Sequence, residues 1–196
     1  SAKDFLNEVY NKVGIKFDVT AQDLTIGALP AAIQCGDSGL INFYSNGQID
    51  IKNQIEANPN FTYNSETYYV IYTGKPGQDG YKGFMPLGGQ YAFVFSDGDL
   101  KTAAHELGHG IFKLEHPFEA YKTSEKSTDF LMDYSSGTVL NHQDWKQIND
   151  PAFKLYAFQS QSSGEFAEKN RFLGDGHATF SSMIFIIKAD ANHLIG

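Results

Sequence analysis

Apolar residues recur along the chain at two spacings, one typical of helices and the other of strands. Between residues 5 and 13 they fall three or four positions apart, which predicts an amphipathic helix that Gly14 ends. Residues 15–19 alternate between apolar and polar side chains, as a half-buried strand does. Residues 68–72 and 90–96 are short apolar runs rich in aromatic and β-branched side chains, and they predict two adjacent strands. The pattern therefore predicts a mixed α+β fold.

Turn-forming residues predict the conformation of two further segments. The pair Asn46-Gly47 separates residues 41–44 from residues 48–51, and this pair favours a tight hairpin between antiparallel strands. Residues 74–89 hold several glycines and prolines without clear periodicity, which is typical of a long loop. Such a loop either shapes the entry to a cleft or is a surface connection without a binding role.

The last third of the chain predicts helices and a final buried element. Residues 143–147 and 152–158 favour helices, separated by the break at Asp150-Pro151. Residues 183–187 are a continuous apolar run, which fits a strand or a buried helix equally well.

The length of 196 residues suits one domain with a sizeable core. We expect a single domain over residues 1–196, with its core in residues 1–158 and a C-terminal extension over residues 159–196. The formal net charge is −8, and lysine and arginine form no stripe along a predicted helix. Nucleic acid and anionic membrane surfaces are therefore not expected partners.

No apolar run has the length needed to cross a bilayer, so membrane insertion is not expected. The first residues include neither a starting Met nor the apolar core of a signal peptide, which suggests a processed or excised domain. Cys35 is the only cysteine, which excludes an internal disulfide and a multi-thiolate metal site. A small buried thiol is the simplest interpretation of this residue.

The segment His105-Glu106-Leu107-Gly108-His109 carries the clearest chemical signal. Residues four apart on a helix lie on one face about one turn apart, so the imidazoles of His105 and His109 can bind one metal ion. Glu106 lies beside the first ligand, where its carboxylate can accept a proton from water at the metal without being a ligand itself. The segment therefore predicts a zinc site with a general base, on a helix from Leu100 to about Gly110 that Asp99 caps.

A catalytic zinc usually has three protein ligands and one open position, so a third ligand is expected. His116 is the first candidate and Glu115 the alternative. In an unbroken helix His116 would lie about 10 Å further along the axis than His109. The helix must therefore break after His109, and Gly110 supplies a backbone that permits the break.

Further along, Met132 and Tyr134 stand in the run Leu-Met-Asp-Tyr-Ser-Ser-Gly. A His-Glu-x-x-His motif, a later histidine and a Met-x-Tyr turn together resemble the metzincin zinc peptidases. The resemblance implies that Met132 lies beneath the metal and that Tyr134 approaches the metal or a developing oxyanion. In those peptidases an edge strand beside the zinc pairs with extended substrate, so we expect residues 90–96 near that edge.

The chain departs from the extended metzincin signature, because Phe112 and Glu115 occupy the positions of its glycine and its third histidine, and His116 follows one residue later. The run from His105 to Pro117 and the later segment Gln143-Asp144-Trp145 look more like the metallopeptidase domains at the C-terminal ends of bacterial polymorphic toxins. This second resemblance covers about residues 68–150.

The resemblance implies a zinc-dependent endopeptidase, with Glu106 and Tyr134 as catalytic residues and zinc bound by His105, His109 and His116. It also implies a protein or peptide substrate, a monomer, secretion or delivery outside the producing bacterial cell, and an inhibitor or immunity protein as a candidate partner. A non-catalytic zinc-stabilised recognition domain, a pseudo-protease and a zinc hydrolase acting on cell-wall amides remain alternatives.

Overall fold

The computed structural model describes residues 1–36, 43–150, 164–166 and 182–193, which form a mixed α+β fold. The helices are α1 (Ala2–Tyr10), α2 (Asn46–Glu56), α3 (Leu100–Phe112), α4 (Pro117–Ala120) and α5 (His142–Asn149), with single 3₁₀ turns η1 (Asn11–Val13) and η2 (Gln78–Gly80). The strands are β1 (Ile15–Ile26), β2 (Tyr68–Tyr72), β3 (Tyr81–Phe84), β4 (Tyr91–Val94), β5 (Gly164–Phe166) and β6 (Ser182–His193).

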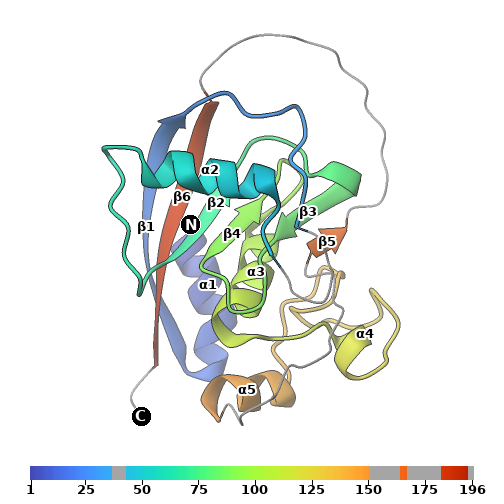
Figure 1. The fold of residues 1–196 in the computed structure, drawn as a ribbon. Coiled ribbons are helices and arrows are strands. Elements are labelled where there is room, and N and C mark those ends of the chain that lie inside the picture. The colour runs from blue at the N-terminus through green and yellow to red at the C-terminus, as the bar shows by residue number, and fades with distance from the viewer. Residues whose placement is uncertain (37–42, 151–163, 167–181, 194–196) are drawn as a thin grey trace.

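The strands form one sheet in the order β1-β6-β2-β4-β3-β5. β2 and β4 are parallel, which requires a crossover connection between them, and the other pairs are antiparallel. The predicted neighbours at residues 68–72 and 90–96 are thus confirmed. β6 comes from the predicted C-terminal extension, yet it lies between β1 and β2 (Figure 1).

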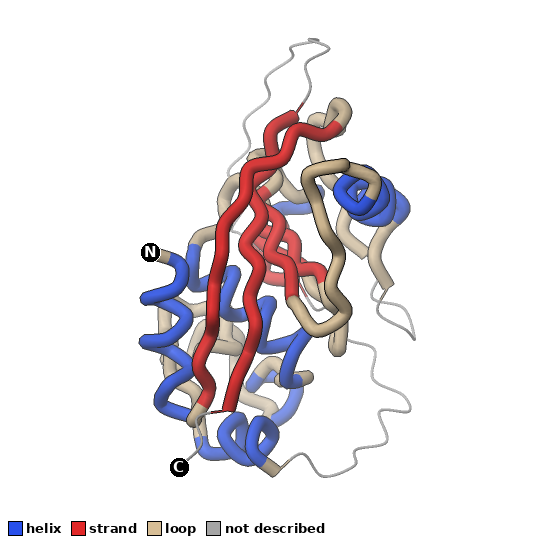
Figure 2. Tube along the Cα trace, turned by 90° about the vertical axis from the view of Figure 1, so that its left-hand side faces the viewer, coloured by secondary structure: helices blue, strands red, loops and turns tan. Residues whose placement is uncertain are grey.

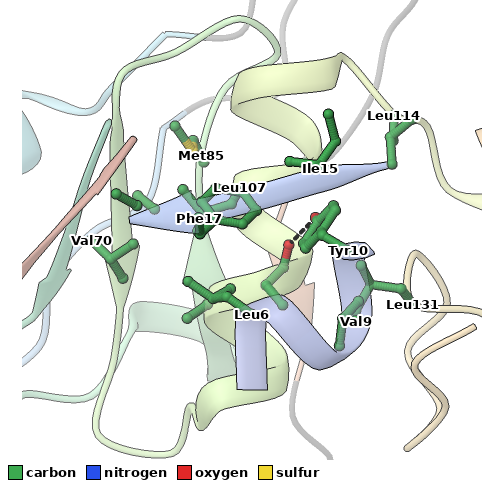
Figure 3. Close-up of a cluster of buried hydrophobic side chains, with 14 of the residues drawn as sticks. Leu6, Val9, Tyr10, Ile15, Phe17, Val70, Met85, Leu107, Leu114 and Leu131 are labelled. Carbon is green, nitrogen blue, oxygen red and sulfur yellow. Dashed lines mark hydrogen bonds between the residues drawn. The ribbon is translucent and has the colours of Figure 1, made fainter. Parts of the chain in front are cut away.

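Helices cover both faces of the sheet. α1 and α3 lie on one face and α2 on the other, which is clearest when the sheet is seen from its side (Figure 2). Each interface has its own cluster of buried apolar side chains. In the cluster under α1 and α3, the Tyr10 hydroxyl donates a hydrogen bond of 2.7 Å to the Ala104 carbonyl, joining the two helices (Figure 3).

The first helix forms as predicted, and Gly14 ends η1 in the left-handed conformation with φ 78°. The predicted hairpin around Asn46-Gly47 is wrong, because this pair lies in the first turn of α2. Ser45 and Gln48 form a capping box, and Gln48, Ile51 and Ile55 are buried at helical spacing. Residues 41–42 of the first predicted strand lie outside the described residues.

The prediction of a long loop over residues 74–89 is also wrong, because the segment contains η2 and β3. β3 pairs with β4 on one side and with β5 on the other. β4 is therefore an internal strand, and the expectation that residues 90–96 lie near the edge of the sheet is wrong.

The remaining predictions concern the C-terminal third. α5 confirms the helix predicted at residues 143–147, and β6 shows that the apolar run at residues 183–187 is a strand. The helix predicted at residues 152–158 lies outside the described residues. Among the helices that the structure describes, none combines the length and apolar character needed to span a membrane.

Candidate metal centre

The centre is built on α3, whose start is fixed by local chemistry. The Asp99 side chain accepts a hydrogen bond of 2.9 Å from the Thr102 backbone N–H, which satisfies one of the free donors at the helix start. The helix predicted from Leu100 to about Gly110 is confirmed and continues to Phe112. His105 and His109 therefore lie on one face, as their spacing predicts.

Three imidazoles meet at one point. The Nε2 atom of His105 lies 3.0 Å from that of His109 and 3.2 Å from that of His116, and the His109–His116 separation is 3.1 Å. All three side chains are buried, with at most 1% of their surface exposed. Zinc–nitrogen bonds of about 2.0–2.1 Å require ligand nitrogens roughly 3–3.5 Å apart, so these three residues lie close enough to bind one metal ion.

The opposite ring nitrogens define the protonation of the centre. Nδ1 of His105 lies 2.9 Å from the Leu131 carbonyl oxygen, and Nδ1 of His109 lies 2.6 Å from the Leu114 carbonyl oxygen. A carbonyl oxygen can only accept, so each Nδ1 carries the proton and a neutral ring has a bare lone pair on Nε2. Nδ1 of His116 faces a carboxylate oxygen of Glu119 at 3.2 Å, which gives the same assignment.

Burial keeps the three rings neutral. Together with the neighbouring imidazoles, it lowers the pKa of His105 and of His109 well below the usual range. Burial, with the positive charge of Lys101, lowers the pKa of His116 to about 3. Three lone pairs therefore converge without a proton between them, an arrangement that a bound cation stabilises.

The chain leaves the helix later than predicted. Gly110 stays helical, and the break falls at Lys113, which is left-handed with φ 55°. A glycine is needed at position 110 for close packing, because a Cβ there would stand 2.0 Å from Cε of Met85 and 2.9 Å from the Gly89 carbonyl oxygen. After Lys113 the chain turns back, and His116 reaches the cluster as the residue before α4. Glu115, the alternative third ligand, is not in the cluster and lines a cavity outside it.

Glu106 lies on α3 next to His105, and its side chain is fully buried. It packs against β3, since a Cβ at Gly83 would come within 2.7 Å of its Oε1 atom and within 2.6 Å of Cγ2 of Thr102. Gly83 thus permits β3 to approach the predicted general base closely. Gly83 could not be recognised from the sequence, because the feature that marks it is a contact with a helix distant in the chain.

The segment after α4 packs beneath the same helix. The sulfur of Met132 would lie 2.8 Å from a Cβ at Gly108, so the methionine contacts the helix turn that carries His109. The Lys101 ammonium donates a hydrogen bond of 2.6 Å to the Asp133 carbonyl oxygen. The Tyr134 ring, mostly buried, has its centroid 4.9 Å from that of His116. These contacts place both predicted turn residues beside the cluster.

The buried Asp133 carboxylate connects several backbone groups of this segment by hydrogen bonds. It accepts hydrogen bonds of 2.7–2.8 Å from the backbone N–H groups of Lys126, Thr128 and Tyr134 and from the Thr128 hydroxyl. Desolvation alone would raise the pKa of Asp133, but these hydrogen bonds outweigh it and hold the pKa below its usual value.

Replacing Asp133 with asparagine is expected to destabilise the protein by about 3 kcal/mol, because the amide leaves buried N–H donors without an ionised acceptor. The carboxylate contributes fully above the unfolded pKa of about 3.9, and its contribution is lost as pH falls toward the lower folded pKa. Urea denaturation at pH 7 and pH 3 measures both effects. Asp129→Asn, at an exposed carboxylate of the same segment, is the control. Equal stability of the two variants at pH 7 would contradict this role.

Cys35 is buried, as predicted for a small structural thiol. It packs in the cluster on the α2 face of the sheet. Burial, with the negative charges of Glu106 and Asp79, raises the pKa of the thiol well above its usual value, which opposes thiolate chemistry at neutral pH.

No protein-family model matches this chain, and neither a curated protein nor a solved structure matches it. The observations that bear on function are therefore the geometry of the cluster and the His-Glu-x-x-His and Met-x-Tyr motifs.

Proposed function

We propose that this protein is a zinc-dependent endopeptidase with a metzincin-like catalytic core. The observation that carries the proposal is the convergence of three buried, neutral imidazoles on one point, each with Nε2 directed inward. Three neutral histidine ligands suit zinc, which binds imidazole readily and uses three protein ligands in its catalytic sites. Glu106, which follows the first ligand on α3, supplies the carboxylate that hydrolysis needs.

His105, His109 and His116 would hold the metal, and zinc supplies Lewis acidity and lowers the pKa of a nearby water toward neutrality. Glu106 then accepts the proton of the attacking water and passes it to the leaving amine. The Tyr134 hydroxyl is proposed to donate a hydrogen bond to the oxyanion, where charge develops only in the transition state.

The biological setting is proposed from the motif resemblance. The substrate is a protein or peptide, and the enzyme acts after secretion or delivery outside the producing bacterial cell, as a toxin or effector protease does. An inhibitor or immunity protein would then protect the producer. The acidic composition, with a formal net charge of −8, disfavours nucleic acid as a partner.

One observation favours a second candidate, a non-catalytic domain stabilised by zinc. His105, Glu106, His109 and His116 are all at most 1% exposed, whereas hydrolysis requires substrate to reach the metal. A closed zinc site would contribute to folding without chemistry. The two candidates share the metal, so zinc content alone does not separate them.

Cleavage of a peptide library by the zinc-loaded protein, with and without a chelator, separates them. We expect fragments that disappear when the chelator is added and return when zinc is restored. A digest of purified cell-wall material in parallel tests the non-protein amide alternative. Stoichiometric zinc with no fragments from the peptides would overturn the peptidase proposal and favour the zinc-stabilised domain.

A further inference from the structure

The three imidazoles differ in what holds their outer nitrogens. Backbone carbonyls of Leu131 and Leu114 hold His105 and His109. His116 alone among the three is held by a side chain, the Glu119 carboxylate, at 3.2 Å from Nδ1. His116 is thus the one imidazole of the three whose outer partner is a side chain, which a substitution can remove without changing the backbone.

His116 also differs in its backbone setting. His105 and His109 lie within α3, where the helix fixes the direction of each side chain. His116 precedes the single turn of α4, in extended conformation with φ −65° and ψ 141°. Its ring orientation must therefore come from side chains around it, since helical geometry does not supply it.

α4 supplies these contacts. The Phe118 ring stacks on the His116 ring with centroids 4.7 Å apart and planes 10° apart. Glu119, three residues after His116, is brought back to the ring by the first turn, in which its own N–H donates to the His116 carbonyl at 3.1 Å. Phe118 fixes the ring plane, and Glu119 fixes rotation within that plane. This one-turn helix thus holds the ring from two directions.

We propose that Glu119 is a positioning residue that orients His116 and directs its Nε2 atom toward the metal, an inference that rests on the proposed zinc site. Glu119 has an oxygen that can accept the Nδ1 proton whether or not the carboxyl is ionised, so the tautomer does not depend on its charge. Glu119 also lines a polar cavity of about 430 Å³ between α4, α5 and the residues that follow α3, together with Glu115 and Lys122. Glu119 thus contacts the cluster through His116 and is not itself one of the three converging residues.

The test is the zinc affinity of the full chain, measured by competition with a chromogenic chelator. Glu119→Ala is expected to weaken zinc binding about 10–100-fold, as loss of a partner behind a metal-bound histidine does. Glu119→Gln keeps an oxygen that can accept the Nδ1 proton and should recover part of that loss. Glu115→Ala, which removes a carboxylate from the same cavity one residue before His116, should leave the affinity unchanged.

The outcomes separate this inference from the proposed function. Zinc bound by the native chain and by Glu119→Ala with equal affinity would overturn the positioning role and leave the zinc site standing. A native chain that binds no zinc would overturn both. If Glu119→Ala fails to fold, Glu119→Met carries the test, because methionine has a similar length but no oxygen that can accept the Nδ1 proton, and native zinc affinity in that variant would overturn the positioning role.

Discussion

Replacing Glu106 with glutamine is expected to leave zinc bound and to lower peptide hydrolysis by about 10²–10⁴-fold, the usual contribution of a positioned general base. Glutamine has nearly the same shape, so the packing of this side chain against Gly83 is retained. Its amide cannot accept the proton of the attacking water, which is the step assigned to Glu106. Initial rates on a labelled peptide, with zinc content measured on the same samples, give both quantities.

Glu115→Gln is the matched control, because it removes the same charge nearby without touching the cluster. This control is expected to cleave at the native rate. Mass-spectrometric profiling of a mixed proteome would then compare the cleavage sites made by the native protein with those made by Glu106→Gln. Cleavage by Glu106→Gln at the native rate would exclude Glu106 as the base.

The part of the centre on α3 was predictable because its determinants are local. The Asp99 cap and the four-residue spacing of His105 and His109 both act within one helix. His116 was the first candidate for the third ligand, and it required a break in the helix, since two ligands of one zinc cannot lie about 10 Å apart along an axis. That argument requires a break but does not locate it. The break falls at Lys113, which takes the left-handed conformation, and Gly110 remains in the helix, where contact with Met85 leaves no room for a side chain. Neither feature can be predicted from the local sequence.

The errors in the fold arise where a local preference competes with a contact elsewhere. Asn46-Gly47 favours a hairpin, but the Ser45–Gln48 capping box and the burial of Ile51 and Ile55 stabilise a helix through the same residues. β3 has only four residues and lies in a glycine-rich segment, so its conformation depends on pairing with β4. Sheet pairing joins segments far apart in the chain, so short strands of this kind have little local signal.

Replacing His116 with alanine is expected to weaken zinc binding by more than 100-fold, beyond the range of about 10–100-fold typical of residues that act behind a ligand. The change removes one of three converging nitrogens and leaves His105 and His109 as a two-nitrogen site. Zinc binding stabilises the folded chain by mass action, so the thermal stabilisation on adding zinc should also shrink. Chelator competition and thermal unfolding with and without zinc measure the two effects.

His142→Ala is the matched control, since His142 is exposed on α5 and stacks on Trp145 outside the cluster. It should keep the native affinity for zinc and the native gain in stability. Glu115→Ala completes the set, because Glu115 is the alternative third ligand in the sequence. If Glu115→Ala lost zinc and His116→Ala kept it, the third ligand would be the Glu115 carboxylate and not the Nε2 atom of His116. Loss of zinc only in His116→Ala would instead tie the metal to three imidazoles, the donor set on which the proposed chemistry depends.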